Sequence, residues 1–179
     1  MAKFNDKEFL QYELDTGVSF DNPNFLRLAE LTAEQMKQYG KSVLDFGAGT
    51  GVYSDAFIRT GFDVVSFEIF PSHKEYIRKY APHIKLIDYP VTTDIMLFIE
   101  TAEHMTNRQI KNLFNRIKPK YILFSSTPEH TAFDEAWGHI NIKQPNEWDA
   151  FFANFGYVNN RSLEYPTSWS KLYLKLNVE

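Results

Sequence analysis

The sequence predicts an α/β fold in which a mostly parallel sheet is covered by helices. Short apolar runs alternate with segments of helical spacing along most of the chain, and a glycine-rich stretch at 47–51 joins the first run to the next helix. The run at 95–99 is apolar without interruption, as expected of a strand that is buried on both faces. Such alternation is typical of parallel sheets whose crossover connections are helices.

The elements of the first half can be read from spacing and from breakers. A helix is expected at 24–39, where apolar side chains recur every three to five positions before Gly40. A strand at 42–46 then leads through the glycines into a helix at 52–60. The unit repeats as a strand, a helix and a strand, at 63–67, 72–80 and 84–87.

In the second half, the buried strand at 95–99 precedes a helix at 107–117 and a fifth strand at 121–125. A polar loop is expected at 126–144. Pro145 fits the first turn of a helix, because its missing N–H would have no partner there. The last elements are therefore a helix at 146–154 and two β-like runs that should pair as a hairpin, at 157–163 and 169–176.

Composition sets limits on function. The chain has 179 residues, which fits one domain, and its 44% apolar and 23% charged residues are close to globular averages. It contains no cysteine, which excludes disulfides, thiolate metal sites and a cysteine nucleophile. The net charge of −4 provides no general basic surface for a nucleic acid or an anionic membrane.

The loop after the first strand has the chemistry of a cofactor site. Its glycines permit positive φ and close approach of backbone N–H groups to a ligand, and the next helix adds the positive end of its dipole. The dinucleotide pattern G-x-G-x-x-G is not met, because Val52 stands where its third glycine would be. Asp45, two positions before the first glycine, favours a ligand with an amine and a sulfonium over a pyrophosphate.

A hydrophobic strand, an acidic residue and G-x-G-x-G together resemble the first motif of the class I S-adenosylmethionine-dependent methyltransferases. The resemblance implies a Rossmann-like, doubly wound, mostly parallel seven-stranded sheet with an antiparallel C-terminal hairpin. It implies that Glu68, after the second strand, binds both ribose hydroxyls, and that Asp88 or Tyr89 meets the adenine. The cofactor ligands expected on this basis are Asp45, Gly47, Ala48, Gly49, Gly51, Glu68, Asp88 and Glu100.

The same resemblance leads us to expect one methyltransferase domain over residues 1–179. Residues 1–40 would form an N-terminal helical cap and residues 41–179 the cofactor-binding core. Within the cap, Tyr12 and Phe20 are candidates either for a lid over the cofactor or for core packing.

Methyl transfer needs an aligned acceptor and, where the acceptor is a hydroxyl, a group that removes its proton. The residues expected to be catalytic are His139, Glu100 and His104, with Trp137 and Trp148 as an apolar floor under His139. His130, in the same loop as His139, is expected to have a supporting or solvent-exposed role.

Two interpretations of the acidic and imidazole groups stay open. In the first, a divalent ion (Mg, Mn or Zn) binds Glu100, Glu103, His104 and His139. The set resembles the small-RNA 3′-terminal 2′-O-methyltransferases and, for its first three members, the ubiquinone-pathway O-methyltransferases. The first three residues would share one face if their loop is helical. In the second interpretation, Glu103 is a first-turn helix charge and His104 bonds a neighbouring loop without metal.

The expected function is methyl transfer from S-adenosylmethionine to an oxygen or nitrogen of a small metabolite or sugar. The alternatives are metal-assisted O-methylation of a nucleic-acid terminus, a nicotinamide-dependent oxidoreductase and a non-catalytic cofactor-binding module. The acidic net charge and the lack of an added RNA-binding segment argue against a nucleic-acid partner. The charged start and the absence of a long apolar run predict a cytoplasmic protein without a membrane partner.

Overall fold

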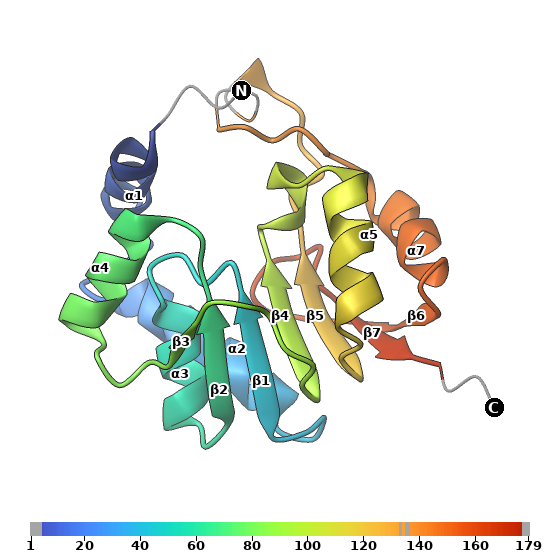
Figure 1. Ribbon diagram of the computed structural model, residues 1–179, viewed down its shortest axis with the longest axis horizontal. Helices are drawn as coiled ribbons and strands as arrows, with labels where there is room; N and C mark the ends of the chain where they lie inside the picture. Colours follow the sequence, from blue (N-terminus) through green and yellow to red (C-terminus); the bar gives the residue numbers. More distant parts are fainter. Residues whose placement is uncertain (1–4, 133, 135–136, 177–179) are drawn as a thin grey trace.

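The computed structural model describes residues 5–132, 134 and 137–176, and the statements below refer to these residues. A seven-stranded sheet forms the centre of the molecule, in the order β3-β2-β1-β4-β5-β7-β6 (Figure 1). Its strands are β1 Ser42–Phe46, β2 Asp63–Phe67, β3 Leu86–Ile87, β4 Ile95–Ile99, β5 Tyr121–Ser125, β6 Tyr157–Ser162 and β7 Lys171–Lys175. The first five strands are parallel, and β7 pairs antiparallel with both β5 and β6. The predicted fold class is confirmed.

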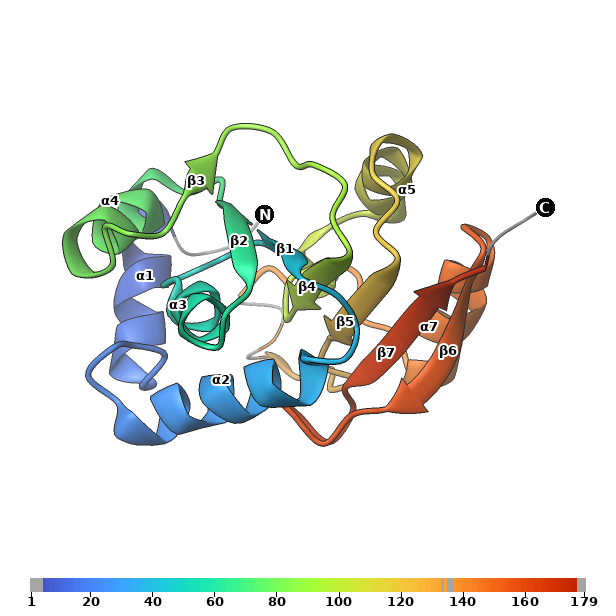
Figure 2. The same ribbon diagram turned by 90° about the horizontal axis from the view of Figure 1, so that it is seen from below.

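The helices are α1 Asp6–Asp15, α2 Pro23–Met36, α3 Val52–Arg59, α4 Pro71–Tyr80, α5 Asn107–Arg116 and α7 Pro145–Ala153, with a short 3₁₀ helix, η1, at Ala102–His104. In the view from below, α2 and α3 lie on one face of the sheet and α5 and α7 on the other (Figure 2). The order of the strands reverses between β1 and β4, since β2 and β3 lie on one side of β1 and the later strands on the other. In sheets of this kind, ligands bind outside the carboxyl ends of the strands at such a reversal.

Each face of the sheet has its own apolar core, because successive side chains of a strand point to opposite faces. Along β4, Met96 and Phe98 pack with α5 and α7 in one cluster, whereas Ile95 and Leu97 pack with α2 and α3 in another. All four side chains are fully buried. The run at 95–99 is apolar without interruption because β4 is buried on both faces of the sheet, as predicted.

Two expected boundaries are wrong. The helix expected at 24–39 ends at Met36, and the chain continues in a turn in which the N–H of Tyr39 donates to the carbonyl of Met36. The strand expected at 84–87 is reduced to Leu86–Ile87. Ile84 instead closes a turn on the carbonyl of Ala81 and packs its side chain beside α4, so its apolar character reflects helix packing.

The N-terminal helix α1 begins with a capping box. The side chain of Asn5 accepts hydrogen bonds from the N–H groups of Lys7 and Glu8, and the carboxylate of Glu8 accepts from the N–H of Asn5. This reciprocal arrangement satisfies donors that the first turn of a helix leaves free. α1 packs beside α4, near the carboxyl ends of the parallel strands (Figure 1).

Among the helices of the described residues, none combines the length and apolar character that crossing a lipid bilayer requires.

Candidate active site

The glycine loop is tied to the end of β2. The N–H groups of Gly47 and Ala48 both donate to the carbonyl of Phe67, at 2.8 and 3.1 Å. Gly47 has a φ of 79°, and a Cβ at this position would lie 2.6 Å from Oγ1 of Thr101. Gly51 caps α3 with a φ of 84°. Both positions, one at the start of the loop and one at its end, have a left-handed backbone and no room for a Cβ, so both require glycine.

Asp45 faces the interior of the protein. Its carboxylate accepts a hydrogen bond from Oγ of Ser54 at 2.6 Å, and the hydroxyls of Ser54 and Ser66 lie 2.7 Å apart. Burial, opposed by the Ser54 hydrogen bond and aided by the charge of Glu68, raises the pKa of Asp45 to about 6. Asp45 does not line either of the two cavities described below. It joins β1 to the first turn of α3.

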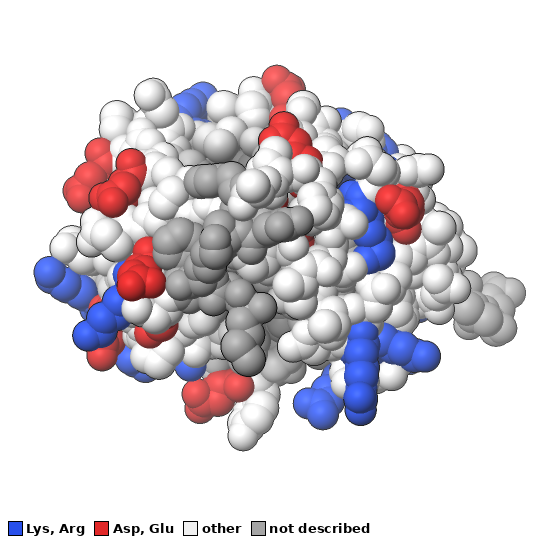
Figure 3. Space-filling model, turned by 90° about the horizontal axis from the view of Figure 1, so that it is seen from above, with Lys and Arg blue, Asp and Glu red and all other residues white. Residues whose placement is uncertain are grey.

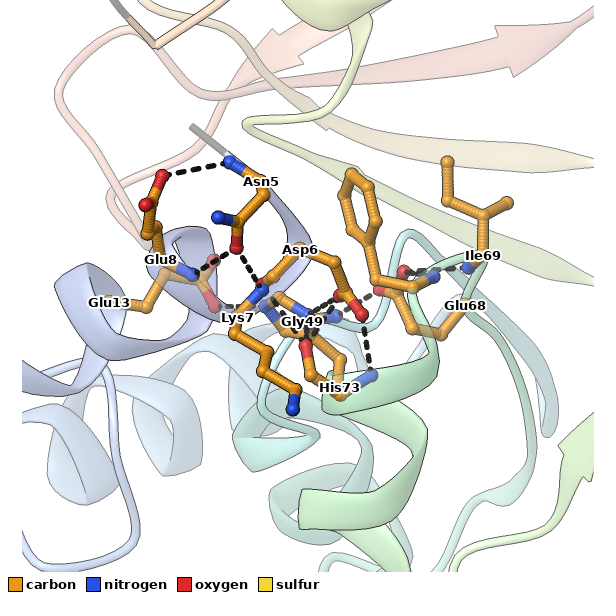
Figure 4. A network of polar contacts seen from close by, with 11 residues as sticks. Asn5, Asp6, Lys7, Glu8, Glu13, Gly49, Glu68, Ile69 and His73 are labelled. Atoms are coloured by element: carbon orange, nitrogen blue, oxygen red, sulfur yellow. Dashed lines mark hydrogen bonds and ion pairs between the residues drawn. The ribbon is translucent and has the colours of Figure 1, made fainter. Parts of the chain in front are cut away.

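Glu68 lies at the end of β2, with its carboxylate held on both sides (Figure 4). Oε2 accepts from the N–H of Gly49 at 2.8 Å, and Oε1 accepts from Ile69 and Phe70 at 2.6 and 2.8 Å. Each carboxylate oxygen can accept two hydrogen bonds, so Oε2 keeps one position for a ligand hydroxyl. Glu68 therefore holds the glycine loop to the end of β2, and it lines the wall of the first cavity described below.

A first cavity of about 560 Å³ opens above this loop. Its lining includes the loop, Glu68 and the rings of Phe46 and Phe67, whose centroids are 5.1 Å apart in a stacked arrangement. The segments after β4 and around Trp137 also line it, with Glu100, Thr101, His104, Met105, Gln109, Trp137, Gly138 and Ile140. The cavity thus brings Gly47, Gly49 and Glu68, predicted for the cofactor, together with Glu100 and His104, predicted to be catalytic, whereas the predicted cofactor residues Ala48 and Gly51 do not line it.

A second cavity of about 400 Å³ adjoins the first and shares part of its wall. The residues that line both cavities are Phe9, Glu13, Glu100, His104 and Trp137. The second cavity also contains His139, Tyr12, Glu103 and Trp169. Of the residues expected at the acceptor, Glu100 and His104 line both cavities, whereas His139 and Glu103 line only the second.

Glu100, directly after β4, has a strained backbone with a φ of 44°. Its carboxylate accepts hydrogen bonds from the N–H of Thr127 and Nε1 of Trp169, both at 3.0 Å, and from the hydroxyl of Ser125. A positive φ in a residue other than glycine costs about 1 kcal/mol or more and persists only where the surroundings impose it. The three donors hold Glu100 at the junction of the cavities.

Glu103, His104 and His139 form a group whose candidate ligand atoms lie within 4.8 Å of one another. Glu103 is almost fully buried, and neither of its carboxylate oxygens has a hydrogen-bond partner among the described residues. Burial and the nearby charge of Glu100 raise the pKa of Glu103 well above its usual value. The loop is helical only at Ala102–His104, so Glu100 lies outside this group, with its oxygens bound elsewhere.

The two histidines are held as neutral rings. Burial and the charge of His139 lower the pKa of His104 to about 4. Burial also lowers the pKa of His139, and the charges of Asp134 and Glu100 offset this only in part. Nδ1 of His139 lies 3.3 Å from Oδ1 of Asp134, and the two imidazole centroids are 4.6 Å apart.

Other predicted residues lie away from the cavities. Asp88 and Tyr89 are exposed and line neither one, as is also true of His130. Trp148, on α7, is buried in the core between that helix and the sheet, so of the two tryptophans expected under His139 it is Trp137 that lines the cavities. Tyr12 lines the second cavity, whereas Phe20 packs against the cores beside α3 and α4.

Sequence reasoning missed the contribution of α1 and α4, namely Phe9, Glu13 and His73. The signal for α1 was available, because Asn5 and Glu8 have the spacing of a capping box. No local pattern connects Glu13 with His73, which is 60 positions further along the chain.

Comparison with known proteins shows to which family the chain belongs. A family model described as a methyltransferase domain matches residues 14–164, most of the chain. The chain belongs to the methyltransferase domain family. This membership confirms the predictions of a class I methyltransferase, of an enzyme and of S-adenosylmethionine as its cofactor. The nicotinamide-dependent oxidoreductase is thereby set aside.

Curated relatives of this methyltransferase include a ubiquinone biosynthesis O-methyltransferase of Actinobacillus pleuropneumoniae serotype 5b (strain L20). It is 31% identical over 127 residues, which are 60% of this chain and 54% of the relative. The mitochondrial ubiquinone biosynthesis O-methyltransferase of Schizosaccharomyces pombe is 25% identical over 58% of this chain and 44% of its own length. The chain thus matches only about half the length of these relatives.

Solved structures share the fold of the methyltransferase. Magnesium protoporphyrin IX methyltransferase from Synechocystis PCC 6803 with bound S-adenosylhomocysteine (SAH) has a TM-score of 0.66 at 13% identity, covering 84% of this chain and 83% of that one. The methyltransferase domain of bacterial CtHen1-C has a TM-score of 0.64 at 15% identity, covering 84% and 98%. At these identities the likeness concerns the fold alone.

Proposed function

We propose that this methyltransferase transfers the methyl group of S-adenosylmethionine to an oxygen or nitrogen of a small metabolite or sugar. The observation that carries the proposal is the shared wall of the two cavities. Glu100 and His104 line both, so a cofactor above the glycine loop and an acceptor in the second cavity would meet beside them. In-line displacement requires this kind of alignment.

The residues of the first cavity fit the cofactor. Glu68 has a free acceptor position for a ribose hydroxyl, and Gly47 and Gly49 place the backbone of the loop, which also includes Ala48 and Gly51, at the cavity wall. Asp45 would act indirectly, by anchoring the loop through Ser54. When bound, S-adenosylmethionine supplies an electrophilic methyl group on a sulfonium.

His139 is the proposed base for a hydroxyl acceptor. Its ring lines the second cavity, and its lowered pKa leaves it neutral at physiological pH, ready to take a proton. Oδ1 of Asp134 lies 3.3 Å from Nδ1 without a hydrogen bond between them, so its negative charge would stabilise the imidazolium that forms when His139 takes a proton. His104 and Glu100 would orient the acceptor at the junction of the cavities.

A second candidate is metal-assisted transfer, which one observation favours. The unpartnered carboxylate of Glu103 lies with His104 and His139 in a group of ligand size. A buried carboxylate without a hydrogen bond is costly unless it is protonated or bound to a cation. These three residues would hold a divalent ion, which would supply Lewis-acid activation of an acceptor hydroxyl. Glu100 would join the set only by leaving its present donors.

A nucleic-acid terminus remains the less favoured acceptor. On the face seen in Figure 3, the Lys and Arg side chains form a few separate clusters near the edge. Binding of a nucleic-acid backbone draws on a continuous basic patch or stripe. The lack of a continuous basic stripe on this face, together with the net charge of −4, supports a small-molecule partner.

The function is tested by incubating the protein with methyl-labelled S-adenosylmethionine and a panel of small hydroxylated and amine metabolites, next to a short RNA. We expect label in a small molecule, dependent on His139, and SAH binding by calorimetry. Transfer to RNA alone would replace this proposal with the nucleic-acid alternative, and absence of SAH binding would overturn it.

A further inference from the structure

We propose that Glu13 of α1 binds the cationic amino group of the cofactor, and that His73 of α4 is the positioning residue that fixes its carboxylate. This inference rests on the proposed function and extends the cofactor site to the N-terminal helix. It assigns a role to two side chains that neither the glycine-loop motif nor the second acidic position includes.

The position of Glu13 carries the first step. A Cβ built on Gly49 would lie 3.5 Å from Oε1 and 3.7 Å from Oε2 of Glu13, so the carboxylate lies directly against the glycine loop. Oε2 is bonded to His73, whereas Oε1 has no hydrogen bond among the described residues. Glu13 therefore presents one free charged oxygen over the loop, on the wall of the first cavity (Figure 4).

The second step concerns which end of the cofactor lies near Glu13. Glu68 lines only the first cavity, whereas Glu13 is one of the few residues that line both. The methyl group must be delivered toward the acceptor cavity, so the methionine end of the cofactor belongs at this junction. That end carries an ammonium group, for which a fixed carboxylate provides a charge-assisted hydrogen bond.

His73, on α4, holds the carboxylate of Glu13 through its ring nitrogen Nε2. Its side chain is fully buried, and Nε2 lies 2.8 Å from Oε2 of Glu13. On the other side of the ring, Nδ1 lies 3.7 Å from Oδ1 of Asp6 and 3.4 Å from the hydroxyl of Ser72. The rings of Phe9 and Phe70 pack beside it, with centroids at 5.7 and 5.5 Å.

The attachment of α1 to α4 makes this geometry rigid. The carboxylate of Asp6 accepts from the N–H of Ser72 at 3.0 Å, and the hydroxyl of Ser72 donates to Asp6 as well. Burial lowers the pKa of His73, but the hydrogen bond to Glu13 and the charges of Glu13, Glu68 and Asp6 outweigh it, so the net shift is upward. Because a carboxylate only accepts, Nε2–H of His73 is the donor to Oε2 of Glu13, and it fixes the direction of that carboxylate relative to α4.

The test compares two ligands by calorimetry. SAH carries the amino group, whereas 5′-methylthioadenosine lacks the amino-acid portion and keeps the adenosine. We expect Glu13→Gln to weaken SAH binding about tenfold or more and to leave methylthioadenosine binding within about twofold. Asp15→Asn, an exposed acid on the same helix, should change neither.

His73 is tested with two variants. His73→Leu should reproduce the selective loss of SAH affinity, and His73→Gln, which keeps a donor toward Glu13, should restore part of it. Equal affinity of Glu13→Gln and wild type for SAH would overturn the inference, as would equal loss of both ligands, which would indicate detachment of α1. If the wild-type protein binds neither ligand, the proposed function fails together with this inference.

Discussion

The carboxylate of Glu68 accepts a hydrogen bond from the N–H of Gly49 at 2.8 Å, across the gap between the end of β2 and the loop after β1. The two features by which the sequence suggested a cofactor site are thus in direct contact. The same carboxylate also holds the N–H groups of Ile69 and Phe70 at the start of α4. Removing it has consequences for both the ligand and the loop.

Glu68→Gln should weaken SAH binding by about 2–3 kcal/mol, because a charged acceptor of ribose hydroxyls is lost while the side-chain volume stays. Glu68→Ala should add a loss of stability, since three backbone N–H groups lose their acceptor. Calorimetry and thermal melting measure the two effects. Glu75→Gln changes an exposed acid on α4 and is the matched control, so it should alter neither SAH affinity nor melting temperature. Unchanged SAH affinity in Glu68→Gln would remove Glu68 from the cofactor site.

Asp45→Asn should change how stability depends on pH. Burial raises the pKa of Asp45 to about 6 in the folded protein, from a reference of 3.8. The folded state therefore holds this proton more tightly, and the free energy of unfolding falls as pH rises from about 4 to about 6. Relative to wild type, Asp45→Asn should gain up to about 3 kcal/mol between pH 4 and pH 7.

Urea unfolding of both proteins at several pH values measures this difference. Asp63→Asn, an exposed acid at the start of β2, controls for the general effect of removing a carboxylate. A pH-independent difference between wild type and Asp45→Asn would show that folding does not change the pKa of Asp45.

Glu100→Gly should be more stable than Glu100→Ala by about 1 kcal/mol. Both variants lose the acceptor of Trp169 and Thr127, but only glycine adopts a φ of 44° without strain. Chemical denaturation of the two variants measures the difference. The usual order, in which alanine is the more stable, would mean that the backbone relaxes when the carboxylate is removed.

A divalent ion should raise the melting temperature if the metal-assisted candidate is correct. Zn²⁺ and Mn²⁺ should stabilise the wild type, because their binding relieves the unpartnered Glu103, and a chelator should reverse the effect. Glu103→Gln and His139→Ala should abolish the shift. His130→Ala, an exposed histidine outside both cavities, should retain it. No shift with any ion would eliminate this candidate.

The order of the elements could be predicted because local patterns encode it. Apolar alternation and glycine breakers gave β1, β2, β4 and β5 with the bounds that the structure shows. The pattern predicted the start of β3 wrongly, because Ile84 packs against α4 and does not belong to the strand. It was also insufficient at α1, whose sequence is mostly polar and whose helix is supported by a capping box and by packing on α4.

The sequence by itself determined that one acidic residue lies near the end of the first strand and that others come directly after the second and fourth strands, around a glycine loop, since these features depend on residue type and spacing alone. Only the tertiary structure decided which way each carboxylate faces. Asp45 turns inward to Ser54, Glu68 lines the cavity, and Glu100 binds donors from β5 and from the loop before β7. Spacing along one strand fixes the position of a charge, whereas its partners, and therefore its pKa and its role, come from segments distant in the chain.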